Sequence, residues 1–196
     1  MPIFQPKDDT DETLIVWLDL ETTGLDPRGG EILEFAAFAS DLDGNRVGSS
    51  IEGVFQHKRE NILTSMDDFV IDMHLKSGLL KRVWSDDSQE HINRRNEGKW
   101  RDIASWFARL PGKPKKRNLG GNSIHFDRTW LQTKQPNLLK NVSHRMLDVS
   151  SLLLIMPQVR ESDLVVEHRA LSDALMSYDT YVKNFMTLLR PQAKIA

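Results

Sequence analysis

The alternation of apolar and polar positions divides the chain into recognisable elements from residue 13 onward. Runs of β-branched and apolar residues predict buried strands at 13–20 and 31–40. The stretch "DLDGN" at 41–45 predicts a hairpin turn into a third strand at 46–55. A helical pattern follows to residue 110, most regular over 92–110, where Pro111 ends it.

The second half of the chain alternates strands and helices. A basic loop at 112–121 runs into a short fourth strand, a helix is predicted at 123–134, and a fifth strand at 144–149 precedes a short helix. The last helix carries an apolar stripe with spacings of four and three residues: Leu171, Leu175, Tyr178, Val182, Phe185 and Leu189. This order predicts an α/β fold, a mixed sheet flanked by helices, in a single domain over 13–196 after a flexible leader at 1–12.

Composition narrows the class of protein without identifying it. The 196 residues suit one domain, and the apolar and charged fractions of 39% and 28% are those of an ordinary globular protein. The net charge of −2 predicts no global attraction to nucleic acid or to an anionic membrane. The absence of cysteine excludes a disulfide framework, a thiol nucleophile and a thiolate zinc site. With no secretion signal and no long apolar stretch, we expect a cytoplasmic protein that does not enter a membrane.

Two acids interrupt the first strand, in the stretch "WLDLETTGL" at 17–25. Because side chains of a strand alternate, Asp19 and Glu21 point to the same face, about 7 Å apart. Such a pair can flank one or two cations, which would offset the cost of placing charges in an apolar strand. The alternative is an edge strand with a solvated acidic face.

Three further titratable residues stand in conspicuous contexts. Asp127 lies just inside a helix that a strand feeds. Asp173 lies near the start of the last helix, roughly 200° from Leu171 and off the apolar stripe. His168 precedes Asp173 by five residues, so the two would diverge by about 140° in a regular helix. A shared site therefore requires His168 in the loop or first turn. Alternatively, Asp173 faces solvent and His168 is a surface histidine.

The stretches "DLETTGL", "GNSIHFDR" and "HRALSDA" resemble the three exonuclease motifs of the DEDD superfamily in its histidine branch. The resemblance implies an RNase H-like fold with a mixed five-stranded sheet and 3′–5′ exonuclease activity that releases 5′ mononucleotides. It implies that Asp19, Glu21, Asp127 and Asp173 bind two divalent cations, Mg²⁺ or Mn²⁺, and that all four are catalytic together with His168. Histidine as the general base suits neutral pH. In two-metal hydrolysis one cation activates water and the other stabilises the departing oxygen.

Two more stretches, "HLKSGL" at 74–79 and "HRMLDVSSL" at 144–152, resemble the oligoribonucleases, which degrade very short single-stranded RNA. This resemblance also implies a homodimer. It implies that the bases are sandwiched by Leu25 and Phe69, and that His74 also contacts the substrate. The terminal phosphate would be capped by Ser123, Arg145 and Ser150.

Three positions depart from the oligoribonuclease pattern. Thr22 stands in place of a methionine, and Phe69 stands in place of a tryptophan. His144 stands in place of a tyrosine that, in the family, reaches the neighbouring protomer. The departures leave the metal-binding acids unchanged. They keep open a general 3′–5′ exonuclease acting on longer RNA or single-stranded DNA; an inactive nucleic-acid-binding module is the third alternative. The basic residues of 113–117 are predicted to form a solvated turn outside the site.

Overall fold

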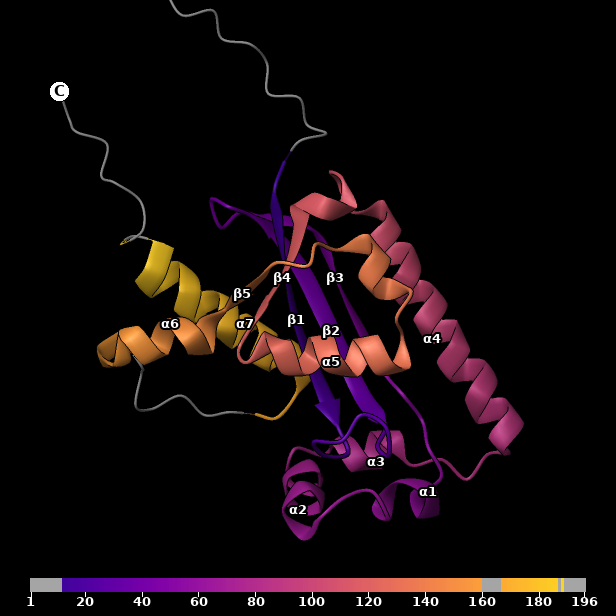
Figure 1. Ribbon diagram of the computed structural model, residues 1–196. Coiled ribbons are helices and arrows are strands. Elements are labelled where there is room, and N and C mark those ends of the chain that lie inside the picture. The colour runs from indigo at the N-terminus through magenta and orange to yellow at the C-terminus, as the bar shows by residue number, and fades with distance from the viewer. Residues whose placement is uncertain (1–11, 160–166, 187, 189–196) are drawn as a thin grey trace, which may run out of the picture.

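Five strands form one mixed sheet in the order β3-β2-β1-β4-β5 (Figure 1). The computed structural model describes residues 12–159, 167–186 and 188. Strand β1 lies in the centre, antiparallel to β2 and parallel to β4, and β3 and β5 form the edges. The strands are β1 (Leu14–Thr22), β2 (Ile32–Asp41), β3 (Arg46–Val54), β4 (Arg117–Gly121) and β5 (Met146–Asp148).

Helices cover both faces of the sheet and its lower end (Figure 1). The helices are α1 (Arg59–Leu63), α2 (Asp68–Lys76), α3 (Leu79–Val83), α4 (Gln89–Arg109), α5 (Ile124–Lys134), α6 (Val149–Ile155) and α7 (Ala170–Thr180). A π-helical turn over Tyr181–Met186 continues α7. Short 3₁₀ segments occur at Pro114–Lys116, Leu138–Asn141 and Pro157–Val159.

The alternation of β1 decides which helices each side chain meets. Val16 and Leu18 belong to the core that β1 shares with α4 and α5. Ile15 and Trp17 belong to a second core with α6 and α7. A third core packs α1, α2 and α3 against the start of β2. Because Asp19 and Glu21 have the same parity as Ile15 and Trp17, they lie on the face that α7 covers.

The predicted α/β architecture is confirmed, with differences at particular elements. The helical middle divides into three short helices and the 21-residue α4. In the last helix, Ala170 and Ala174 are fully buried, whereas the larger Leu171 and Leu175 are only partly buried. The small alanines let α7 approach the sheet closely. Leu189 and nearly all of the predicted leader lie outside the described residues.

The basic turn at 113–117 was expected to be solvated, and for Arg117 this is wrong. Its side chain is 4% exposed. The guanidinium donates hydrogen bonds to four carbonyl oxygens where α4 ends, those of Phe107, Leu110, Pro111 and Gly112. Arg117 therefore supplies donors to backbone carbonyl oxygens at and just beyond the end of the helix.

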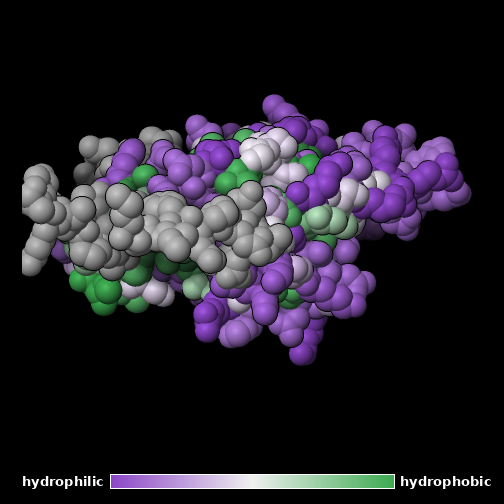
Figure 2. All heavy atoms as spheres, turned by 90° about the horizontal axis from the view of Figure 1, so that it is seen from above, coloured by the Kyte–Doolittle hydropathy of each residue, from purple (hydrophilic) through white to green (hydrophobic). Residues whose placement is uncertain are grey.

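Apolar side chains on the outside of the molecule are the subject of two observations. No helix in the described part of the chain is long and apolar enough to cross a bilayer. Apolar side chains nevertheless reach solvent on α6, where Leu154 and Ile155 are 81% and 75% exposed. Figure 2 shows hydrophobic surface at the left of the molecule, where α6 extends in Figure 1.

Candidate active site

The carboxyl end of β1 supplies the first two acids. Asp19 is half-buried and Glu21 is 6% exposed, because β1 is paired on both sides within the sheet. Both side chains point to the α7 face. Burial raises the pKa of Asp19 well above its usual value, and the charges of Asp127 and Glu21 raise it further. Two acids so close to other carboxylates are unfavourable in their charged form unless a cation is near.

Helix α5 brings Asp127 against the same strand. Its carboxylate Oδ1 accepts a hydrogen bond of 2.9 Å from the backbone N–H of Leu20, between the two acids of β1. Asp127 is 3% exposed. Burial raises its pKa to about 8, although the hydrogen bond from Leu20 acts in the opposite direction.

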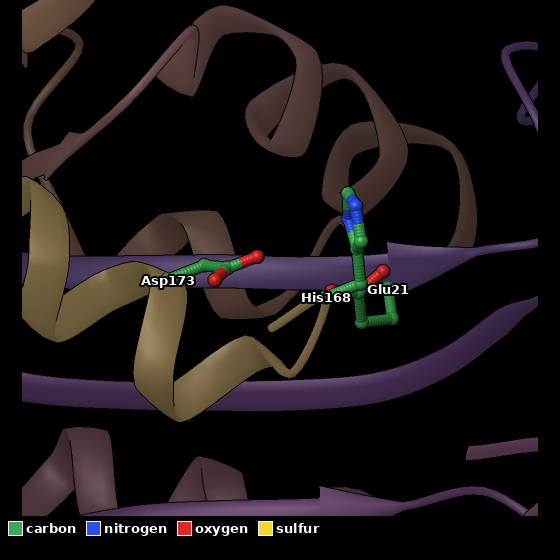
Figure 3. A group of neighbouring side chains, drawn as sticks. All are labelled: Glu21, His168 and Asp173. Atoms are coloured by element: carbon green, nitrogen blue, oxygen red, sulfur yellow. The ribbon is translucent and has the colours of Figure 1, made fainter. Parts of the chain in front are cut away.

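Asp173 and His168 reach the site from α7 and the loop before it. Figure 3 shows Asp173 pointing from the first turn of α7 toward Glu21 and His168. One potential ligand atom from each of these three residues lies within 4.8 Å of the others. His168 lies before the helix, in the left-handed region with φ 51°, which is the loop placement that a shared site requires.

The electrostatics of the cluster fit divalent cations. Burial, with the charges of Asp173 and Glu34, raises the pKa of Glu21 to about 8. The pKa of Asp173 rises to about 6, chiefly through burial. Four crowded carboxylates with raised pKa values form an oxygen donor set of the kind that Mg²⁺ and Mn²⁺ prefer. A bound cation would supply the positive charge that favours their ionised form.

His74 occupies a different position from the one expected. Its side chain has no exposed surface. The imidazole Nε2 lies 2.9 Å from the carbonyl oxygen of Thr22, and Nδ1 lies 3.8 Å from a Glu21 carboxylate oxygen. A side chain without exposed surface is not open to a ligand, so the structure places His74 behind Glu21 and not in direct substrate contact.

The two residues expected to sandwich bases are both on the surface. Leu25 is 85% exposed and Phe69 is 74% exposed. Phe69 and His168 line the same cavity of about 590 Å³, together with Met73, Lys76 and Arg169. An exposed aromatic side chain beside a cavity is consistent with base stacking and excludes the interpretation of Phe69 as a core residue.

The expected phosphate-capping residues are partly assembled. The hydroxyl oxygens of Ser123 and Ser150 lie 3.4 Å apart. Asp148 holds them together, because its Oδ1 accepts the backbone N–H of Ser123 at 3.0 Å and the hydroxyl of Ser150 at 2.6 Å. Arg145 is exposed. The exposed Arg145 guanidinium is a donor suited to a phosphate, whereas the Ser150 hydroxyl already donates to Asp148 in this structure.

Sequence reasoning missed Asp148, Glu34 and Arg169. Glu34 lies directly opposite Glu21 in the β1–β2 register and is 2% exposed. Arg169 donates from Nε and Nη2 to the two Glu34 carboxylate oxygens at 2.9 and 2.6 Å. The signal for Glu34 was present: it interrupts the apolar run "EILEFAAF" as Asp19 and Glu21 interrupt β1.

Comparisons with known proteins complete these observations. The exonuclease family model RNase_T matches residues 16–181. The chain is 34% identical over 178 residues to an oligoribonuclease of Corynebacterium diphtheriae, covering 88% of this chain and 80% of that one. It is also 34% identical over 176 residues to an oligoribonuclease of Neisseria meningitidis serogroup B, covering 86% and 89%.

Solved structures show the same fold at low sequence identity. The Mg²⁺- and Mn²⁺-bound form of S. pombe Pop2p has a TM-score of 0.54 and 12% identity, covering 86% of this chain and 81% of that one. The zinc-bound form of the E. coli ExoI–ssDNA complex has a TM-score of 0.54 and 13% identity, covering 93% and 42%. These likenesses agree with the RNase H-like sheet expected from the sequence.

Proposed function

The chain belongs to the exonuclease family and, within it, to the oligoribonucleases, and from this premise we propose that it is a 3′–5′ exoribonuclease. Its substrates would be very short single-stranded RNAs, cleaved to 5′ mononucleotides. The observation that carries the proposal is the convergence of Glu21, Asp173 and His168 within 4.8 Å, with Asp127 bonded to the same strand. Residues of β1, α5, α7 and the loop before α7 lie close together, which supports the proposal.

The acids of β1, α5 and α7 would hold two divalent cations, Mg²⁺ or Mn²⁺. The bound cations would neutralise charge around the phosphorus and lower the pKa of the attacking water. The chain's own residues do the rest. Asp19, Glu21, Asp127 and Asp173 fix the cations, and His168 accepts the proton of the attacking water at an imidazole nitrogen.

Substrate binding would use few contacts, which explains how a nearly neutral chain binds a polyanion. Leu25 and Phe69 would sandwich bases, and Ser123, Arg145 and Ser150 would cap the terminal phosphate of a short strand. A cap on the terminal phosphate blocks longer strands and so selects for length. The exposed surfaces of Leu25, Phe69 and Arg145 support this assignment.

We further propose a cytoplasmic homodimer. The exposed apolar side chains Leu154 and Ile155 on α6 support a self-association surface, because such side chains gain from burial. His144 is exposed, so it is available to a neighbouring protomer. The single domain would span residues 13–196.

A general 3′–5′ exonuclease acting on longer RNA or on single-stranded DNA is the second candidate. The departures at Thr22, Phe69 and His144 favour it. Chain-length preference separates the two. The experiment is Mn²⁺-dependent hydrolysis of 5′-labelled RNAs of two, five and twenty nucleotides beside matched DNA, with Asp127→Ala as the blank. Rapid loss of the two-mer with slow attack on the twenty-mer is expected. Comparable cleavage of all lengths would favour the general exonuclease.

The same experiment tests the inactive-module alternative. Asp127→Ala removes a carboxylate from a crowded negative cluster, so the variant should stay folded and lose cleavage. No Mn²⁺-dependent turnover of any substrate by the unmodified chain would mean a binding module without chemistry. Near-normal turnover by Asp127→Ala would overturn the metal assignment.

A further inference from the structure

Glu34 differs from the neighbouring acids because the protein itself supplies its partners. Its carboxylate is 2% exposed and lies between the sheet and the start of α7. Arg169 binds both carboxylate oxygens through Nε and Nη2, and Arg82 approaches one of them at 3.6 Å. A two-pronged arginine contact fixes orientation as well as distance.

The same carboxylate also caps α7. Arg169 is the N-cap residue of the helix and its side chain makes no capping hydrogen bond. Instead, Glu34 Oε2 accepts the backbone N–H of Ala170 at 3.1 Å. A carboxylate at a helix N-terminus satisfies an open N–H and interacts favourably with the helix dipole. The start of α7 is thus set by a residue of β2, distant in sequence.

These contacts fix the backbone on the carboxyl side of His168. Arg169 and Ala170, the two residues after it, are both bound to Glu34. His168 itself has φ 51°, a conformation that a non-glycine residue adopts only where its surroundings hold it. Its imidazole must meet Glu21 and Asp173 from a loop, where its own helix gives no support.

Resting on the proposed function, we infer that the Glu34–Arg169 pair is a positioning device that holds His168 where it accepts the proton of the attacking water. A buried ion pair is weak evidence for stability, because desolvation offsets much of its attraction. Geometry, in contrast, is decisive for proton transfer, since a displacement of about 1 Å costs on the order of a hundredfold in rate. The pair acts through His168 and does not touch the substrate.

The test is a double-mutant cycle on the full chain with a two-nucleotide RNA and Mn²⁺. Glu34→Gln keeps the shape of the side chain and weakens the arginine contact, and Arg169→Lys keeps the charge and loses the fork. Each is expected to lower kcat by about ten- to a hundredfold, with KM and the Mn²⁺ dissociation constant within about twofold. In a His168→Ala background the same changes should cost less than about twofold further.

A matched control is Glu31→Gln, which removes a carboxylate paired with Lys134 at 3.3 Å, away from the loop. It should leave kcat unchanged. An equal loss of kcat from Glu34→Gln with and without His168, or no loss at all, would overturn the inference. The first result would mean that the pair supports the whole site, and the second that His168 is held by other contacts.

Hydrogen exchange separates this inference from the proposed function. Glu34→Gln and Arg169→Lys should speed amide exchange in the peptide that contains 167–171 while the melting temperature stays near that of the parent. This readout needs no activity, so it holds even if the parent cleaves no RNA. Unchanged exchange in that peptide would refute the positioning role whatever the enzyme's substrate.

Discussion

Replacing Asp127 with asparagine isolates the cost of one buried carboxylate in the metal-free protein. Asp127→Asn keeps an oxygen to accept the Leu20 N–H and removes the charge. The pKa of Asp127 is raised by burial to about 8 in the fold, against about 3.9 in an unfolded chain. Between these values the folded state binds more protons than the unfolded state. Its stability therefore falls as pH rises from about 4 to 8.

The expected magnitude follows from that interval. From pH 4.5 to 7.5 the wild-type chain should lose about 4 kcal/mol of unfolding free energy through this group, at 1.36 kcal/mol per unit. Asp127→Asn should not lose this part. Its buried amide hydrogens add a cost of about 1–3 kcal/mol, which is the same at every pH. The slope with pH is therefore the quantity to compare, not the stability at one pH.

Urea unfolding in EDTA at pH 4.5, 6.0 and 7.5 measures that slope for both proteins. The stability of the variant relative to wild type should increase steadily with pH. Adding Mn²⁺ at pH 7.5 should stabilise wild type more than the variant, because ligand binding to the folded state stabilises it. A difference in unfolding free energy between the two proteins that does not change with pH, or equal stabilisation of both by Mn²⁺, would refute the argument. Asp127 would then not be a buried carboxylate whose charged form needs a bound cation.

Three further substitutions test separate parts of the molecule. Arg117→Met should lower the unfolding free energy by about 2–4 kcal/mol in urea titrations, because it removes the hydrogen bonds that the guanidinium donates to four carbonyl oxygens at the end of α4. The substitution Lys115→Met, at an exposed position, should have little effect. Phe69→Ala should raise KM for a two-nucleotide RNA about tenfold with kcat nearly unchanged, since one stacked base contributes about 1–3 kcal/mol; an unchanged KM would remove Phe69 from the substrate site. Leu154→Asp should convert the proposed dimer to a monomer in sedimentation velocity, and an unchanged sedimentation coefficient would place the interface elsewhere.

The strands and the long helices could be predicted because their signals are local. Period-two and period-3.6 patterns report which face of an element is buried, and these faces are the ones that pack here. The placement of His168 before α7 was also accessible, because helical geometry forbids it from sharing a site with Asp173 in any other way. The order of the three motifs then predicted that His168 and Asp173 share a site with the acids of β1 and α5.

What the sequence could not show were contacts between distant backbone groups and side chains. Arg117 lies in a basic run that looks solvated, and only the folded end of α4 reveals the carbonyl oxygens that it binds. His74 lies on a surface helix whose inner face becomes evident only when α2 packs beside Thr22. Arg169 resembles any charged residue before a helix until β2 places Glu34 beside it. Each case depends on a partner in another segment of the fold, for which no periodic signal exists.

Glu21 and Glu34 together suggest how the protein distinguishes a ligand from a structural acid. They are cross-strand partners, both nearly buried and of the same residue type. Glu34 receives a forked guanidinium and a helix N–H from the chain, so its charge is already balanced. Glu21 faces the His74 Nδ1 at 3.8 Å, beyond hydrogen-bond distance, and its pKa is raised to about 8. In the proposed site a cation would be the partner of Glu21, whereas Glu34 is already bound by Arg169, so exchanging the roles of the two acids would require moving Arg169 as well.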